Sequence, residues 1–226
     1  MTAPRPAASV VVARDSATGM EVLMVQRGRG ASFMANAWVF PGGRVDDSDG
    51  PVSERASFAA AAVRELAEEA AIRLDAAGLR AFARWITPSA EPRRFDALFF
   101  LTAAPLDPAD QAARPDAGET VASRWDRPAV LMAEHEAGTL RLPPPTFAML
   151  EDLSAFPSVS AALAWAEAQP IEPILPKLVA LSDEGISGGR PAILLPWDPD
   201  YASHPGEGEP WPAEHPLARV RTRFVF

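Results

Sequence analysis

The chain has 226 residues and no cysteine, and its 30 acidic side chains outnumber its 21 basic ones, for a net charge of -9. The lack of cysteine excludes a disulfide scaffold, a Cys-ligated zinc site and a thiol nucleophile. Nucleic acids and anionic membranes bind to positive potential, so we expect neither as a partner of so acidic a chain. No apolar run approaches the roughly 20 residues of a membrane span, and we expect a cytoplasmic protein.

The first two thirds alternate between short apolar runs and alanine-rich segments. Apolar runs at 9–13 and 22–26 flank a turn-rich segment at 15–19 and predict a hairpin. Further strands are expected at 38–40, 82–86, 95–102 and 121–125, and helices at 57–71 and 128–137. This alternation predicts an α/β fold.

The last third differs in composition, because 14 of the 24 prolines lie from Pro143 to Pro216. We expect two helices, then a strand, a loop and a strand-like terminus, at 146–156, 158–169, 192–195, 198–216 and 218–226. We therefore expect residues 1–156 to form the main domain and 157–226 a helical and proline-rich extension.

The terminal segment has the pattern of an edge strand with one wet face. Basic side chains alternate there with less polar ones: Arg219, Arg221 and Arg223 against Val220, Thr222 and Phe224. Apolar side chains of this region are too large to stay in solvent: Leu194, Leu195, Trp197, Trp211, Phe224, Val225 and Phe226. We expect the extension to pack on the core or on a partner subunit and to help form a homodimer.

Three glutamates, Glu65, Glu68 and Glu69, lie at i, i+3 and i+4 of the helix expected at 57–71. On a helix they share a sector of about 100°, so their charges repel one another. A hard divalent cation such as Mg²⁺ or Mn²⁺ reverses this effect, because it prefers carboxylate oxygens. The alternative is a solvated acidic face, relieved by Arg64 and Arg73.

The residues around these glutamates favour the metal site. Phe40-Pro41-Gly42-Gly43 stands upstream, and Arg64-Glu65-Leu66-Ala67-Glu68-Glu69 lies on the helix. Together they resemble the Nudix box: Gly, five residues, Glu, seven residues, Arg-Glu-hydrophobic, any residue, Glu-Glu, any residue, Gly, hydrophobic. The resemblance implies a Nudix α/β/α sandwich with a mixed sheet, and metal-dependent hydrolysis of a nucleoside diphosphate linked to another group X. It also implies Glu65, Glu68 and Glu69 as ligands of Mg²⁺ or Mn²⁺, oriented by Arg64.

The box, which spans about 43–72, departs from the family pattern in its length and at two positions. Arg64 follows Gly43 by 21 positions, which implies a seven-residue insertion. Counted back from Arg64, the first glutamate of the box falls on Ala56, while Glu54 lies nearby but out of register. Ala71 replaces the closing glycine, which we expect to be tolerated because that position has no strict need for a positive φ. These changes leave a catalytically weak Nudix-fold binding module as an alternative, against which the intact glutamate triad argues.

The approach to the box resembles the Nudix branch related to peroxisomal coenzyme A diphosphatases. Its residues are Phe33, Met34, Ala37, Val39 and Phe40. In the substrate signature of that branch Leu23 and Arg27 match, but other residues replace the remaining marked positions: Met24, Val25, Gly28, Ser32 and Asn36. The branch implies coenzyme A or acyl-coenzyme A as the substrate, cut to a phosphopantetheine product and adenosine 3′,5′-bisphosphate. Nucleotide sugars and dinucleotides such as NADH, and ADP-ribose, are the alternative substrates.

Substrate binding and proton transfer have separate candidates. Guanidinium groups bind phosphate oxygens well, and the candidate substrate-binding residues are Arg27, Arg44, Arg93 and Arg94, with Gly42 and Gly43 of the box. The general base is either a box glutamate or Glu119, in the sequence Gly118-Glu119-Thr120.

Overall fold

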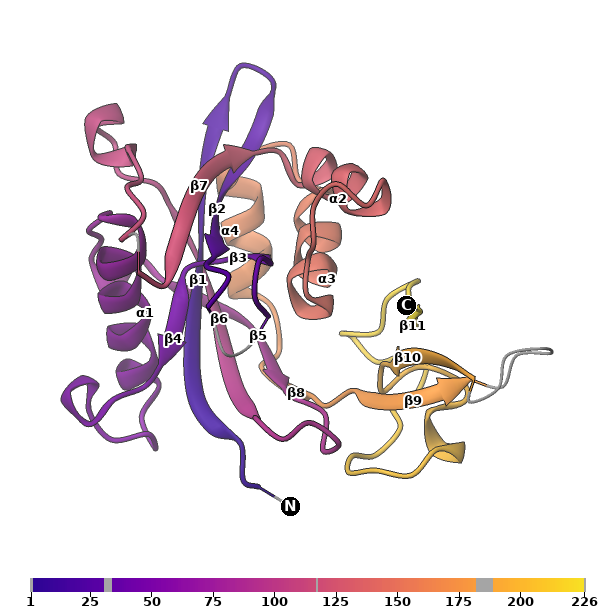
Figure 1. The fold of residues 1–226 in the computed structure, drawn as a ribbon. Coiled ribbons are helices and arrows are strands. Elements are labelled where there is room, and N and C mark those ends of the chain that lie inside the picture. Colours follow the sequence, from indigo (N-terminus) through magenta and orange to yellow (C-terminus); the bar gives the residue numbers. More distant parts are fainter. Residues whose placement is uncertain (1, 31–33, 117, 182–188, 226) are drawn as a thin grey trace. The chain divides into compact units, whose positions relative to one another are not determined.

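The computed structural model describes residues 2–30, 34–116, 118–181 and 189–225 (Figure 1). The strands are β1 (Arg5–Ser16), β2 (Gly19–Arg27), β3 (Trp38–Val39), β4 (Gly42–Arg44), β5 (Arg80–Ile86), β6 (Phe95–Ala103), β7 (Thr120–Asp126), β8 (Pro173–Ile174), β9 (Lys177–Leu181), β10 (Arg190–Leu194) and β11 (Arg223–Val225). The α-helices are α1 (Arg55–Ala70), α2 (Pro128–Glu136), α3 (Pro144–Leu153) and α4 (Val159–Glu167). Four 3₁₀ turns are η1 (Asp47–Asp49), η2 (Ala76–Gly78), η3 (Pro108–Gln111) and η4 (Tyr201–Ser203). None of the described helices is both long and apolar enough to span a bilayer.

The chain divides into two compact units. Residues 6–82 and 98–168 form the first, which we call the sandwich unit, and residues 2–5, 83–97 and the described part of 169–226 form the second, the C-terminal unit. The boundary therefore differs from the one expected after residue 156. Helix α4 stays with the sandwich unit because Trp165 packs on Phe82 and Phe156, with ring centroids 5.7 and 5.2 Å apart.

The sandwich unit is built on a mixed sheet with helices on both faces. Its strand order is β3-β2-β1-β6-β5, with β4 paired to β1 and β7 paired to β2. Figure 1 shows α1 on one face of this sheet and α3 and α4 on the other. The run Val10–Ala13 is wholly buried, as a central strand covered on both faces requires. The expected hairpin is confirmed, since β1 pairs antiparallel with β2 and Ser16 lies opposite Gly19.

Helix α1 carries the glutamates and packs through small side chains. Ala61, Ala62, Leu66 and Ala70 are fully buried on its inner face, so its backbone can come close to the sheet. The helix ends at Ala71, which takes the left-handed conformation with φ 57° and donates its N–H to the carbonyl of Ala67. The expectation that this position needs no positive φ is therefore wrong, and alanine there costs about 1–2 kcal/mol.

Replacing Ala71 by glycine should stabilise the protein. Glycine enters the left-handed region without the clash of a Cβ, but loses more backbone freedom on folding, so the net gain is about 0.5–1 kcal/mol. Urea unfolding of wild type and A71G measures this gain. A67G, inside the same helix, is the control and should lose about 1 kcal/mol; if A71G were destabilised as well, the strain at Ala71 would be refuted.

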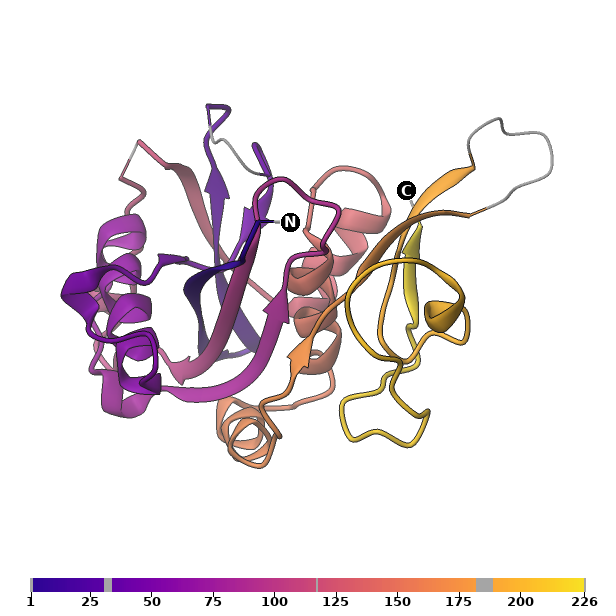
Figure 2. The ribbon, with the colours of Figure 1, turned by 90° about the horizontal axis from the view of Figure 1, so that it is seen from below.

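The C-terminal unit contains a second, smaller sheet. Strands β9, β10 and β11 are antiparallel in the order β11-β10-β9 (Figure 2), and β8 pairs in parallel with the end of β5. Strands β4, β8 and β9 were not expected from the sequence. The terminal strand begins only at Arg223, so Val220, expected on its covered face, is fully exposed at 102%, and that part of the prediction is wrong.

Polar contacts organise the interior of the C-terminal unit. Lys177 is 6% exposed, and its ammonium group donates to the carbonyls of Tyr201 and His204, at 3.0 and 2.9 Å. The Arg223 guanidinium donates two hydrogen bonds of 2.6 Å to the carboxylate of Asp198. Four of the apolar side chains expected to be docked are buried beside these contacts: Leu194, Leu195, Trp197 and Phe224. Trp211 is half-buried, and Val225 is 43% exposed, so the expectation is wrong for Val225. Phe226, Phe33 and Ser32, used in the sequence analysis, lie outside the described residues.

Candidate active site

The three glutamates lie on the second half of α1 and have unequal environments. The Arg64 guanidinium donates to Glu65 Oε1 at 2.8 Å and to Glu68 Oε2 at 3.2 Å. Glu69 is 3% exposed and its Oε2 accepts the N–H of Gly42 at 3.0 Å. Its Oε1 is buried without any hydrogen-bond partner. A buried carboxylate oxygen without a partner is costly and calls for a ligand.

Burial sets the protonation of the two inner glutamates. It raises the pKa of Glu69 to about 7; the charges of Glu65 and Glu119 act in the same direction, whereas the Gly42 N–H and the charge of Arg27 oppose it. Burial also raises the pKa of Glu65, against the stabilising hydrogen bond from Arg64. Both carboxyl groups are therefore harder to ionise than an ordinary glutamate.

Two glycines allow a strand to lie between β1 and the glutamates. Strand β4 pairs with β1, with Gly42 opposite Ser9 and Gly43 opposite Ala8. A Cβ at Gly43 would overlap the Glu65 carboxylate, and one at Gly42 would overlap the backbone carbonyl of Ala8. The bare backbone of Gly42-Gly43 therefore approaches the carboxylates closely and brings the Gly42 N–H donor to Glu69.

Arg64 is held in place by Asp49, a residue that the sequence analysis missed. The carboxylate of Asp49 accepts two hydrogen bonds from Arg64, from Nε at 3.0 Å and from the terminal NH₂ at 2.9 Å. The Asp49 side chain is only 5% exposed, and its hydrogen bond to Arg64 holds the pKa of its carboxyl below the usual range. Such a bidentate pair fixes the guanidinium in one plane.

The position of Asp49 gives a second alignment of the box. Counted forward from Gly43, five residues lead to Asp49, and in this alignment the insertion follows Asp49, which takes the place of the first glutamate. Ala56 lies eight residues before Arg64 on α1, about 12 Å away along the axis. Glu54 is exposed and makes no side-chain cap hydrogen bond. Counting from both ends of the motif would have found Asp49.

Glu119, in the loop before β7, and Arg27, the last residue of β2, act on the triad through their charges. The Asp116 carboxylate accepts the N–H groups of Gly118, Glu119 and Thr120 at 3.1, 3.2 and 2.8 Å. The Thr120 hydroxyl donates to the carbonyl of Glu69 at 3.0 Å, which ties this loop to α1. The charges of Glu119 and Arg27 both act on the pKa of Glu69.

The other predicted arginines have different surroundings. The Arg44 side chain is exposed and lies 3.6 Å from Asp46, while its carbonyl accepts from Arg64 at 2.9 Å. Arg93 is exposed, in the C-terminal unit. Arg94, in the same unit, is 4% exposed and donates to Glu207 at 2.6 Å and to the carbonyl of Thr87 at 3.1 Å. These contacts commit Arg94 to the packing of its unit. Its partner Glu207 is 113 positions away and could not be predicted from the sequence.

The residues at the C-terminal half of α1 fit a divalent cation. In the part of the chain that the structure describes, no three carboxylate or histidine side chains converge as a ready-made metal site. Arg64 instead binds two of the glutamates, and the third has a partnerless oxygen. Three carboxylates beside a glycine backbone are oxygen donors of the type that Mg²⁺ and Mn²⁺ prefer.

An α/β sandwich in which a glycine pair packs against an acidic helix is typical of Nudix proteins. Comparison with known proteins leads to the same family. The family described as NUDIX domain matches residues 3–144, and the chain belongs to this family. A Caenorhabditis elegans protein named "Putative nudix hydrolase 7" is 32% identical over 185 residues, which cover 66% of this chain and 60% of that protein. The chain thus spans less than two thirds of the length of this relative.

A solved structure supports the fold. The crystal structure of a NUDIX hydrolase from Alicyclobacillus acidocaldarius matches with a TM-score of 0.63 and 27% identity, over 73% of this chain and 97% of that one. The expected α/β sandwich is therefore confirmed. The coenzyme A branch and the individual site residues stay predictions.

Proposed function

We propose that the protein hydrolyses a diphosphate bond in a nucleoside diphosphate linked to X, with coenzyme A or acyl-coenzyme A as its substrate. The observation that carries the reaction type is the buried, partnerless oxygen of Glu69 within the Arg64-bound glutamate cluster. Family membership supports the same reaction class.

The role that we propose for each residue follows from its contacts. Glu65, Glu68 and Glu69 would hold Mg²⁺ or Mn²⁺, which, when bound, neutralises diphosphate charge and lowers the pKa of water. Asp49 fixes Arg64, and Arg64 keeps Glu65 and Glu68 oriented on α1. Either Glu119, on its tied loop, or a box glutamate accepts the proton of the attacking water.

The choice of coenzyme A depends on Arg27. This residue matches the substrate signature, and its charge reaches Glu69 at the candidate active site. A hydrolysis screen with Mg²⁺ and Mn²⁺ across coenzyme A, NADH, ADP-ribose, diadenosine polyphosphates and nucleotide sugars tests this choice; the phosphate-monoester products are separated by chromatography or converted to inorganic phosphate by an added phosphatase. Cleavage of a nucleotide sugar or a dinucleotide without cleavage of coenzyme A would establish the alternative; metal binding without any turnover would establish a binding module.

Replacing Arg27 by alanine should raise KM for coenzyme A about tenfold and change KM for NADH less. Coenzyme A carries a 3′-phosphate that NADH lacks, so only the first substrate loses a charge-assisted hydrogen bond. The exposed Arg73, replaced by alanine, is the control and should leave both KM values unchanged. An equal rise for both substrates would mean that Arg27 binds the shared diphosphate.

The expected homodimer and the cytoplasmic location stay part of this proposal. Sedimentation of the full chain against a chain ending before Trp197 tests the role of the C-terminal segment in dimer formation. An unchanged mass and heat stability after truncation would remove that role.

A further inference from the structure

The backbone of Glu119 is fixed on both sides by hydrogen bonds. Its N–H donates to Asp116 Oδ2 at 3.2 Å, and its carbonyl accepts the N–H of Gly28 at 2.8 Å. Asp116 Oδ1 accepts the N–H groups of Gly118 and Thr120, at 3.1 and 2.8 Å. One carboxylate therefore holds the peptide N–H groups of Glu119 and of both its neighbours, and hydrogen bonds to an ionised acceptor are the stronger kind.

Thr120 connects this loop to the end of α1. It is completely buried, and its hydroxyl lies 3.0 Å from both the carbonyl of Glu69 and Asp116 Oδ1. Thr120 also lies opposite Arg27 of β2. The backbone beside Glu119 is thus anchored to the helix and to the sheet, all within the sandwich unit, whereas Asp116 itself is exposed.

The side chain of Glu119 differs from the box glutamates because it is uncommitted. It is exposed and makes no hydrogen bond or ion pair with the described part of the chain. Its charge nevertheless raises the pKa of Glu65 and of Glu69, so it acts at the candidate active site. A general base must be free to accept a proton and must be held within hydrogen-bonding reach of it.

We infer that Asp116 is a positioning residue for the hydrolysis: its carboxylate holds the backbone of Glu119 so that the Glu119 carboxylate can accept the proton of the attacking water. This inference rests on the proposed function and selects Glu119 over a box glutamate as the base. Asp116 acts through Glu119 and does not itself touch the substrate. A misplacement of about 1 Å at a reacting group can lower the rate about 100-fold.

A double-mutant cycle with coenzyme A and Mg²⁺, or with whichever substrate of the screen the wild type cleaves, tests the inference. D116A should lower kcat about 100-fold and change KM by less than about threefold. D116N keeps one acceptor oxygen and should lose only about tenfold. E119Q should lower kcat by about 100-fold or more. D116A added to E119Q should cost less than about twofold further, because the group that Asp116 positions is already gone.

Hydrogen exchange in EDTA measures the positioning without turnover. The amides of Gly118, Glu119 and Thr120 should exchange about tenfold faster or more in D116A than in wild type, and at the wild-type rate in E119Q. Circular dichroism checks that each variant is folded, and D116N replaces D116A in the cycle if D116A is not.

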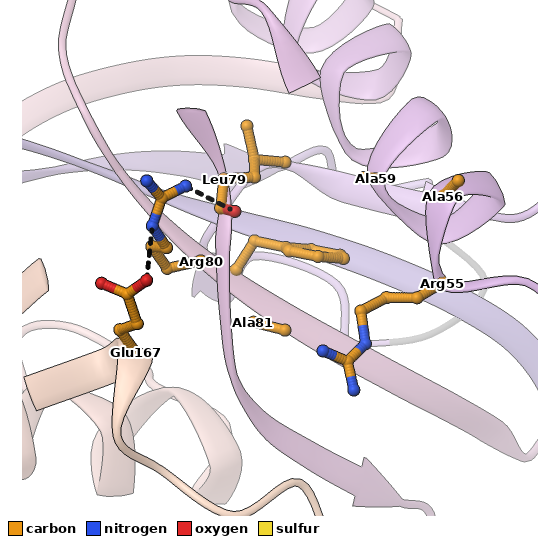
Figure 3. Close-up of a pocket in the computed structure, with 8 residues that line it drawn as sticks. Arg55, Ala56, Ala59, Leu79, Arg80, Ala81 and Glu167 are labelled. Atoms are coloured by element: carbon orange, nitrogen blue, oxygen red, sulfur yellow. Dashed lines mark hydrogen bonds and ion pairs between the residues drawn. The ribbon is translucent and has the colours of Figure 1, made fainter. Parts of the chain in front are cut away.

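Two control variants separate this effect from loop closure and from charge. Asp107 is an exposed aspartate that accepts the N–H of Ala109 at 2.8 Å in another loop, so D107A breaks a similar contact elsewhere. Glu167 is exposed and lies 3.9 Å from Arg80, at the pocket near the start of α1 (Figure 3). E167Q removes one negative charge there. Both variants should keep kcat within about twofold of wild type.

Three results would overturn the inference while hydrolysis by the wild type, and with it the proposed function, still stands. They are a wild-type kcat in D116A, losses that multiply in the double variant, and unchanged exchange of the three amides. Full activity of E119Q would also overturn it and make a box glutamate the base. If the wild type hydrolysed no substrate of the screen, the proposed function would fail first and this inference with it.

Discussion

Replacing Glu69 by glutamine should abolish nearly all hydrolysis while leaving the fold at least as stable as wild type. Glutamine keeps an oxygen for the Gly42 N–H but removes a carboxylate charge from the cluster that we assign to the cation. Loss of several kcal/mol of metal-supplied stabilisation lowers kcat by about 10³-fold or more. Steady-state hydrolysis with Mg²⁺ or Mn²⁺ measures this loss, and circular dichroism checks the fold.

The exposed Glu54 provides a matched control, because E54Q removes the same charge without touching the cluster. E54Q should keep full activity. If the wild type still hydrolysed its substrate in excess EDTA, the metal mechanism would be refuted, whatever the outcome for E69Q.

The same residue should give the metal-free protein a distinctive pH dependence. The pKa of Glu69 is about 7 in the folded state against 4.5 for an ordinary glutamate, so the folded state holds this proton more tightly than the unfolded one. Its contribution to stability is fully present below about pH 4.5 and is lost as the pH rises through 7, on the order of 3 kcal/mol. Urea unfolding in EDTA between pH 5 and 8 should show this decline in wild type and a smaller one in E69Q; parallel curves would contradict it.

Much of the fold could be predicted because its signals are local. The apolar run Val10–Ala13 and the alanine-rich α1 have periodicity and propensity that tertiary packing reinforces. Strand β4 could not be predicted in this way, because Gly42 and Gly43 have low strand propensity. They form a strand because they pair with β1 and because the Glu65 carboxylate leaves no room for a side chain at Gly43.

Only those residues of the candidate site that follow a regular helical spacing could be predicted from the sequence. Helical spacing gathers Glu65, Glu68 and Glu69 and requires no knowledge of the rest of the chain. Two other contacts connect residues that are far apart in the sequence. Arg94 donates to Glu207, 113 positions away, and Arg64 donates to Asp49, 15 positions away. Contacts between distant segments depend on the folded backbone and leave no period in the sequence.

Replacing Asp49 by asparagine should lower kcat by about 10- to 100-fold and raise the metal concentration needed for half activity by a similar factor. Residues that orient metal-binding groups have effects of this size. Asparagine keeps one oxygen acceptor but loses the charge that holds the Arg64 guanidinium in its bidentate pair. Glu65 and Glu68 then lose the fixed donor that orients them, whereas KM should change by less than threefold because Asp49 lies behind Arg64.

The chain offers controls that separate positioning from mere stability. Asp47 is an exposed neighbour in the same loop, and D47N should keep wild-type kinetics. D49E, which restores the charge, should recover much of the metal response, while A56E added to D49N should recover none, because position 56 is about 12 Å from Arg64 along α1. Recovery by A56E would show that the first acidic residue of the box belongs at 56 after all, and that the pairing of Asp49 with Arg64 only closes the loop.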